Sequence, residues 1–128
     1  MVVGRYAYML LAWAFVVGVL VQVFLIGLGL FDDPGSVQLH VDFGWILHLS
    51  PILIVIAAAV ARAGRRRILQ AVALAAIVFV VPILPSLREA APVVAALHPV
   101  LAVLAFGAAV GVAIAATRFV RMGGAGGG

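Results

Sequence analysis

Residues 39–61 read LHVDFGWILHLSPILIVIAAAVA, an apolar stretch that carries two of the three histidines of the chain. A helix needs about 20 apolar residues to cross the hydrocarbon core of a bilayer, and this stretch is long enough. Inside lipid a segment has to satisfy its own backbone hydrogen-bonding groups, so the stretch is predicted to be helical. It therefore favours a membrane protein built from helices.

The composition of the whole chain supports the same class. Of its 128 residues, 67% are hydrophobic and only 9% are charged, whereas a soluble domain is about half apolar and about a quarter charged. There is no cysteine, which excludes disulfides and thiolate metal sites. The sequence pI of 11.2 is typical of nucleic-acid binders, but the charges fall at the ends of apolar runs. We therefore expect a lipid bilayer, and no nucleic acid, as the partner.

Four apolar runs are long enough to span a membrane: residues 7–31, 39–61, 68–87 and 93–117. The segments between them are short turns, so successive spans run in opposite directions. We predict an all-α, up-down-up-down four-helix bundle in one transmembrane domain, residues 1–121, with a flexible Gly-rich tail at 122–128. Five glycines are candidates for close approach between helices: Gly18, Gly27, Gly29, Gly107 and Gly111.

The distribution of charge predicts the orientation of the bundle. Seven of the eight arginines fall on one side of the spans, namely Arg5, Arg62, Arg65, Arg66, Arg67, Arg118 and Arg121. Arg88 falls on the other side with all four acids, Asp32, Asp33, Asp42 and Glu89. Because cytoplasmic loops are enriched in Lys and Arg, both termini are expected in the cytoplasm, and the chain in the inner (plasma) membrane of the cell.

The histidines are predicted to lie in the acidic half of the bundle. Spans two and four are parallel, and Arg62 and Arg118 mark their basic ends. His40 lies 22 residues before Arg62, and His98 lies 20 residues before Arg118. At 1.5 Å per residue their depths differ by only about 3 Å, whereas His48 lies about 9 Å deeper than His98. The depth comparison pairs His40 with His98.

This pairing suggests a b-type haem as the cofactor. Positions 40, 44 and 48 share one helix face, and Gly44 leaves a gap there that suits the edge of a flat macrocycle. Neutral imidazole is a common axial ligand of haem iron, and helix bundles hold cofactors in their cores. We predict a haem site formed by His40 and His98 as axial iron ligands, with Gly44 and His48 beside them.

Structural roles for the same histidines are the alternative. His40 at the membrane interface would meet water and headgroups. Pro99 would then occupy the first turn of span four, with His98 as a boundary residue. His48 would bond Ser50 or Gln22, contact a haem propionate, or replace His40 as the ligand.

Three segments carry a family resemblance: AWAFVVGVLVQVFLIGLGLF, then LHVDFGWILHL, then AALHPVLAVLAFG. Together they resemble a family of small bacterial four-span membrane proteins known only as a domain of unknown function, over about Tyr6 to Arg118. The resemblance implies membership and no activity. More distantly, histidines that open spans two and four resemble one four-helix half of haem A synthase, in which such pairs hold haem. That family has a glutamate three residues before the span-two histidine, where this chain has Val37, so the resemblance implies haem binding without haem A synthesis.

Three functions follow from these observations. The first is a membrane b-type cytochrome that passes electrons, with quinol or a partner subunit. The second is a non-catalytic structural or accessory subunit of a larger membrane complex or homo-oligomer, and the third is a small transporter, for which the spans carry few polar groups. A zinc site of Asp32, Asp33, Asp42 and His40 is a further alternative, although aspartates beside a turn more often cap it. Whether the chain catalyses a reaction is left open.

Overall fold

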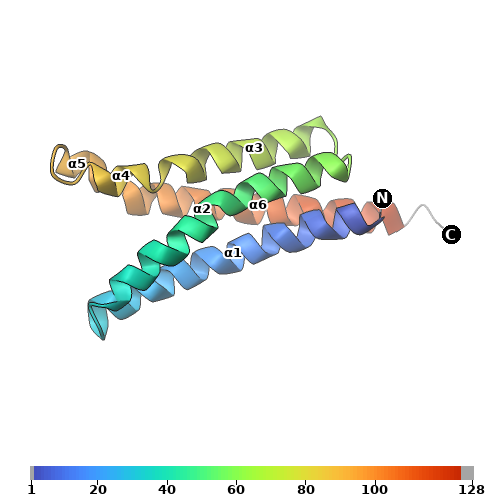
Figure 1. Cartoon of the computed structure of the whole chain (residues 1–128). Coiled ribbons are helices and arrows are strands. Elements are labelled where there is room, and N and C mark those ends of the chain that lie inside the picture. Colours follow the sequence, from blue (N-terminus) through green and yellow to red (C-terminus); the bar gives the residue numbers. More distant parts are fainter. Residues whose placement is uncertain (1, 125–128) are drawn as a thin grey trace.

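The computed structural model describes residues 2–124 and, within them, consists of helices joined by short turns, with no strand (Figure 1). The helices are α1 (Val2–Phe31), α2 (Ser36–Val60), α3 (Arg65–Val80), α4 (Ile83–Ser86), α5 (Pro92–Ala95) and α6 (His98–Gly124). Four segments are long and apolar enough to cross a membrane: Val2–Phe31, Ser36–Val60, Arg65–Ser86 and Pro92–Gly123. The all-α four-span bundle predicted from the sequence is therefore confirmed. Helix α6 extends through residues 122–124, where the tail was expected to begin, and the rest of that tail lies outside the described residues.

The four spans form a square in which α1 and α3 occupy opposite corners. Helix α1 packs against α2 and α6, and α3 packs against the same two helices. Helices α2 and α6 therefore face each other across the diagonal, and both run in the same direction (Figure 1). The start of α1, the α2–α3 turn and the end of α6 share one end, which we call the basic end. The α1–α2 and α4–α5 turns, which hold three of the four acids, lie at the opposite, acidic end.

The core is packed in the basic half of the bundle and rich in alanine. Its members include Tyr8, Ala12, Ile54, Ala58, Ala61, Ala71, Leu74, Ala109, Ala113 and Ala116, each at most 2% exposed. Small side chains let helix backbones approach closely, which is how transmembrane helices gain packing energy in the absence of a hydrophobic driving force. Large apolar side chains such as Phe24, Ile46 and Val103 point outward, where lipid would cover them.

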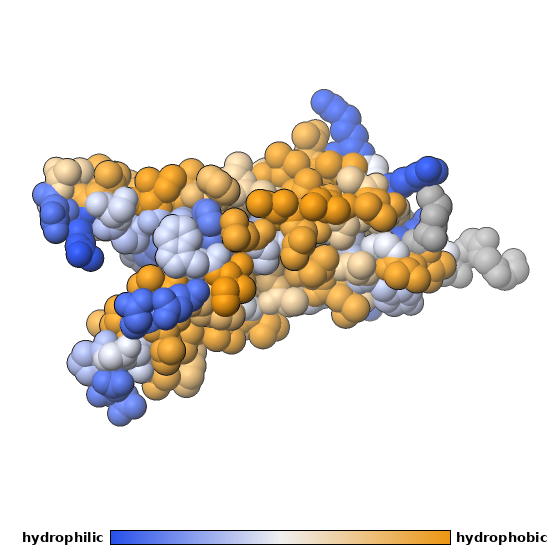
Figure 2. All heavy atoms as spheres, viewed as in Figure 1, coloured by the Kyte–Doolittle hydropathy of each residue, from blue (hydrophilic) through white to orange (hydrophobic). Residues whose placement is uncertain are grey.

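At the acidic end the bundle opens into two hairpins. The hairpin of α1 and α2 diverges from the hairpin formed by α4, α5 and the start of α6 (Figure 1), and the space-filling view is hollowed between them (Figure 2). Within the described residues, the main cluster of buried side chains ends at Val78 on α3 and begins at Ala105 on α6. We call this opening the fork.

Spans three and four, each predicted to be one helix, are both interrupted, and prolines account for the break in span three. Helix α3 ends at Val80, and Pro82 precedes the short α4, which contains Pro85. Proline lacks the N–H that an interior helical residue donates to the carbonyl four residues earlier, so a helix breaks or kinks there. Pro99 is the second residue of α6, as predicted for a proline in a first turn.

The turn between α2 and α3 depends on two positive φ angles. Arg62 has φ 51° and Gly64 has φ 88°. The Arg62 N–H donates to the Ala59 carbonyl at 2.9 Å, and the Ala63 N–H donates to the Ala58 carbonyl at 3.0 Å. These two bonds form a Schellman motif, in which a left-handed residue closes the helix and satisfies its last carbonyls.

Only two of the five candidate glycines lie against another helix. A Cβ on Gly18 would come within 2.5 Å of Leu47 Cδ1, and one on Gly29 would meet Val37. Gly27, Gly107 and Gly111 have open space where a Cβ would stand. The expectation of close packing at these three positions is therefore wrong for contacts within the chain, because they face away from the other spans.

Candidate functional site

The structure brings His40 and His98 together at the fork. Their ring centroids lie 6.5 Å apart, with the ring planes at 81°. Both side chains are half-buried, and they come from α2 and α6, the two parallel helices on the diagonal of the square. The depth comparison from the sequence placed them at the same level for this reason. Their role as iron ligands stays a prediction.

Each ring of the pair is held through its Nδ1 atom. His40 Nδ1 lies 3.0 Å from the Gln22 carbonyl of α1, and His98 Nδ1 lies 2.9 Å from the Val81 carbonyl. A carbonyl oxygen can only accept, so Nδ1 is the protonated nitrogen in both rings. In a neutral imidazole this leaves the Nε2 lone pair free, which is the arrangement found in metal-ligating histidines.

The acceptor of His98 is a carbonyl that proline leaves without a helical partner. In a continuous helix the N–H of residue 85 would donate to the carbonyl of Val81, but residue 85 is proline. The His98 ring, from another helix, supplies the missing donor. An unsatisfied backbone group in hydrocarbon costs several kcal/mol, and transmembrane helices tolerate proline when a neighbouring helix supplies a partner.

His48 makes the same kind of contact, with an acceptor carbonyl about one helical turn deeper than that of Val81. Its Nδ1–H donates to the Val78 carbonyl at 3.2 Å, and the residue four positions after Val78 is Pro82. The His48 ring also lies 4.6 Å from the ring of Phe79 and 5.8 Å from that of Trp45, measured between centroids. His48 is therefore tied to α3, and it bonds neither Ser50 nor Gln22.

A third proline follows the same rule within its own helix. Pro51 lies inside α2 and removes the donor to the Leu47 carbonyl. The Ser50 hydroxyl donates to that carbonyl at 2.7 Å. Three prolines of spans two and three thus free three carbonyls, and each of these three carbonyls has a side-chain donor. The sequence predicts the acceptor of each contact, because a proline identifies the freed carbonyl four residues earlier. It does not predict the donor, because the packing of the helices decides which side chain reaches that carbonyl.

The gap at Gly44 is filled by Gln22. A Cβ at Gly44 would lie 2.6 Å from the Gln22 side-chain nitrogen, so the glycine makes room for this amide. The expectation that the gap is open to a macrocycle is therefore wrong in this conformation, because α1 places a side chain there. The Gln22 side-chain oxygen is buried without a hydrogen-bond partner, which adds a free acceptor near the His40–His98 pair.

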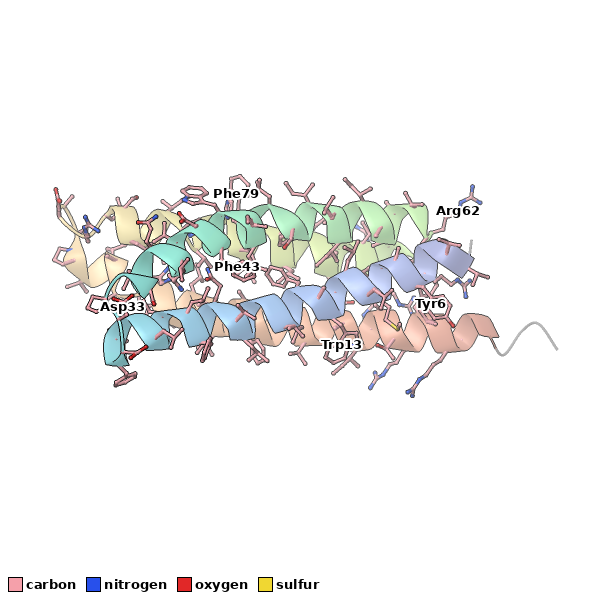
Figure 3. The ribbon with its side chains drawn as sticks, turned by 60° about the horizontal axis from the view of Figure 1, so that its bottom comes forward. Tyr6, Trp13, Asp33, Phe43, Arg62 and Phe79 are labelled. Atoms are coloured by element: carbon pink, nitrogen blue, oxygen red, sulfur yellow. The ribbon has the colours of Figure 1, made fainter. Side chains whose placement is uncertain are left out.

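The aspartates have local roles. Asp33 Oδ1 accepts a hydrogen bond from the Gly35 N–H at 3.0 Å, and Asp42 accepts one from the Gln38 amide at 2.7 Å. Figure 3 shows Asp33 at the end of the bundle opposite Arg62 and Tyr6. Among residues 2–124 no three His, Cys, Asp or Glu side chains form a group that would hold a metal ion, so the zinc alternative lacks its ligand set there.

Fold and site together define a small multi-pass membrane protein with a histidine pair at the open end of its bundle. The chain belongs to the family described as a family of unknown function (DUF6220), whose model matches residues 22–87, just over half of the sequence. The match includes His40, Gly44 and His48 and leaves out His98, so it is narrower than the resemblance noted above. It carries no sign of a bacterial origin or of likeness to haem A synthase. No curated protein and no solved structure matches the chain.

Proposed function

We propose that this protein binds a b-type haem at the fork, with His40 and His98 as the axial ligands. One observation carries the proposal: the two rings come from diagonal helices, their centroids lie 6.5 Å apart, and each has its Nδ1–H on a backbone carbonyl. Two Nε2 lone pairs are thereby left free at the open end of a helix bundle, a common place for cofactors.

The residues present fit such a group in spacing and in donor chemistry. A metal–imidazole bond is about 2 Å long, so two imidazoles that bound one metal from opposite sides would hold their nitrogens about 4 Å apart. Ring centroids stand farther back than the ligating nitrogens, and the 6.5 Å separation matches this requirement. The Gln22 amide beside Gly44 is the end of a flexible side chain, which can move aside at small cost.

The chain's own contribution is to hold two imidazoles in one tautomer and orientation. Hydrogen bonds to Gln22 and Val81 fix the tautomer and orientation of the rings, and such partners make the ligating nitrogen more basic. A bound haem supplies one-electron redox chemistry. The protein would accordingly act in electron transfer with a membrane partner.

Haem stoichiometry tests this proposal directly. The chain is expressed with haem supplied and purified in detergent, and the haem bound per chain is measured for wild type, His40→Ala, His98→Ala and the matched control His48→Ala. We expect about one haem in wild type and in the control, and little in the other two variants. Equal haem in all four variants would remove His40 and His98 as ligands.

A structural or accessory subunit is the second candidate, and a specific observation favours it. His48 and His98 each donate to a carbonyl freed by proline, which gives both rings a complete structural task without a cofactor. Under this function the protein is colourless, it associates with a partner subunit or a second copy, and substitution of the histidines lowers stability alone.

Topology forms part of the proposal. Seven arginines and both ends of the described chain gather at the basic end, and the positive-inside rule assigns that end to the cytoplasm. Because the sequence has no cysteine, single cysteines introduced at Arg66 and Arg88 give clean labels. We expect an impermeant thiol reagent added to intact cells to label position 88 and not position 66. The opposite pattern would reverse the orientation.

A further inference from the structure

Two arginines converge on one aromatic ring at the basic end. The guanidinium carbon of Arg5, from α1, lies 4.4 Å from the centroid of the Phe119 ring in α6. The guanidinium carbon of Arg67, from α3, lies 4.9 Å from the same centroid. Three helices thus bring two like charges within about 10 Å of each other. We call Arg5, Arg67 and Phe119 the arginine pocket.

Both arginines are held in place by their surroundings. Arg67 Nη1 donates to the Ala63 carbonyl at 2.9 Å. The Arg5 guanidinium packs so closely on Gly123 that a Cβ there would overlap it. Both arginines are half-buried, whereas the other five arginines of the basic end are exposed. Such ordering costs side-chain entropy, which an exposed arginine retains.

Among residues 2–124, no Asp or Glu side chain lies at the basic end to balance the two charges. All four acids belong to the α1–α2 turn, the acidic-end half of α2 and the α4–α5 turn, and the other arginines of the basic end add to the positive charge. Repulsion between half-buried charges exceeds that between charges in water, because the effective dielectric constant is lower. An anion bound beside both guanidinium groups would offset this repulsion.

A buried hydroxyl beside the pocket lacks a partner. Tyr8 is 0% exposed, and its hydroxyl oxygen makes no hydrogen bond. Tyr8 stands three residues after Arg5 in α1, so the two side chains lie on the same side of that helix. Buried polar groups are nearly always satisfied, so the unpaired hydroxyl is an independent sign that a polar group is missing at this place.

We propose that the arginine pocket binds a phosphate group, with an anionic phospholipid headgroup as its source. Guanidinium groups match phosphate oxygens in paired hydrogen bonds, and basic pockets between transmembrane helices bind anionic headgroups. The exposed side chains of Val2, Val3 and Met122 lie at the same end and offer an apolar surface to acyl chains, which a free phosphate ion would not need. This site is independent of the haem proposal.

Lipid titration followed by native mass spectrometry tests the site on the full chain. The ligands are short-chain phosphatidylglycerol, phosphatidylcholine with the same acyl chains, and inorganic phosphate. We expect saturable binding of one phosphatidylglycerol and much weaker binding of the other two. Inorganic phosphate binding as tightly as phosphatidylglycerol would overturn the lipid source and leave a phosphate site. Equal binding of phosphatidylcholine would overturn the proposal.

Two pairs of variants locate the binding. Arg5→Gln with Arg67→Gln removes the pocket, and Arg62→Gln with Arg66→Gln removes the same charge from exposed positions. Loss of two surface charges weakens anionic-lipid binding by roughly thirtyfold in either pair, and we expect roughly tenfold more loss in the pocket pair. Equal losses would show non-specific attraction and overturn the site. The double variant Arg5→Lys with Arg67→Lys keeps both charges, so it is the variant most expected to fold like wild type. If it bound phosphatidylglycerol as tightly as wild type does, a site that depends on guanidinium groups would also be overturned.

Discussion

The ring of His98 donates its Nδ1–H to the backbone carbonyl of Val81 at a distance of 2.9 Å. This carbonyl has no helical donor because residue 85 is proline. The contact therefore joins the start of α6 to the broken end of α3 at the depth where the bundle opens. It also fixes the tautomer in which Nε2 of His98 keeps a free lone pair, so one hydrogen bond contributes both to the fold and to the candidate site.

A double-mutant cycle measures this relationship. We expect His98→Ala to destabilise the wild-type chain by about 1–3 kcal/mol, because it leaves the half-buried Val81 carbonyl unpaired. In a Pro85→Ala background residue 85 regains an N–H for Val81, so the same His98 substitution should cost about 1 kcal/mol less. Unfolding free energies in mixed detergent micelles give both values. If His98→Ala cost the same free energy in both backgrounds, the Val81 carbonyl would not depend on His98 for its hydrogen-bond donor.

Substitutions of His48 test whether this histidine stabilises the fold or binds haem. His48→Leu removes the donor to Val78 while keeping an apolar side chain between Trp45 and Phe79, and we expect a loss of about 1–3 kcal/mol in unfolding free energy. His48→Gln keeps an N–H donor and should recover part of that loss. Bound haem per chain should be unchanged in both variants. A large loss of haem in His48→Leu would instead make His48 a ligand.

The glycines predict a graded series of alanine substitutions. Gly29→Ala brings a Cβ to 3.1 Å from the backbone nitrogen of Val37, which cannot easily move, whereas Gly18→Ala meets only the end of the Leu47 side chain. Gly111→Ala meets nothing, and alanine gains about 1 kcal/mol over glycine in helix propensity. We expect stability in the order Gly111→Ala, Gly18→Ala, Gly29→Ala, from highest to lowest, in thermal unfolding. Strong destabilisation by Gly111→Ala would indicate that this face is covered by a second copy or a partner.

The α2–α3 turn offers a test that does not involve the histidines. Gly64 has φ 88° and ψ 151°, a region that is essentially restricted to glycine and costs other residues about 1–3 kcal/mol. Gly64→Ala should therefore lower the unfolding free energy by about that amount. Ala63→Gly is the control on the same turn, where no positive φ is required. Equal stability of wild type and Gly64→Ala would show that the turn adopts another conformation.

The spans were predictable from the sequence because hydrocarbon imposes length and composition on any segment that crosses it. The His40–His98 pair was also accessible, since two parallel spans with arginines at one end share a depth scale. The filling of the Gly44 gap was not, because it depends on the rotation of α1 about its axis. The environment of Gly107 and Gly111 was not predictable either, because a small-residue motif does not determine whether its helix face packs against another span.

The contacts at the prolines could be predicted from the sequence only in part. A proline inside a span identifies a freed carbonyl from sequence alone, as Pro82 does for Val78. The donor comes from a residue 30 positions away, so it depends on which helices are neighbours in the square. Four spans with short turns leave several such arrangements open, and packing selects one.

An absorption spectrum of the detergent-purified protein, recorded oxidised and then reduced with dithionite, shows whether the fork holds haem. We expect a Soret band with sharp α and β bands on reduction, present in wild type and His48→Ala and lost in His40→Ala and His98→Ala. A colourless wild-type protein, expressed with haem supplied and correctly folded, would contradict haem binding and leave the histidines as donors to the broken backbone of span three.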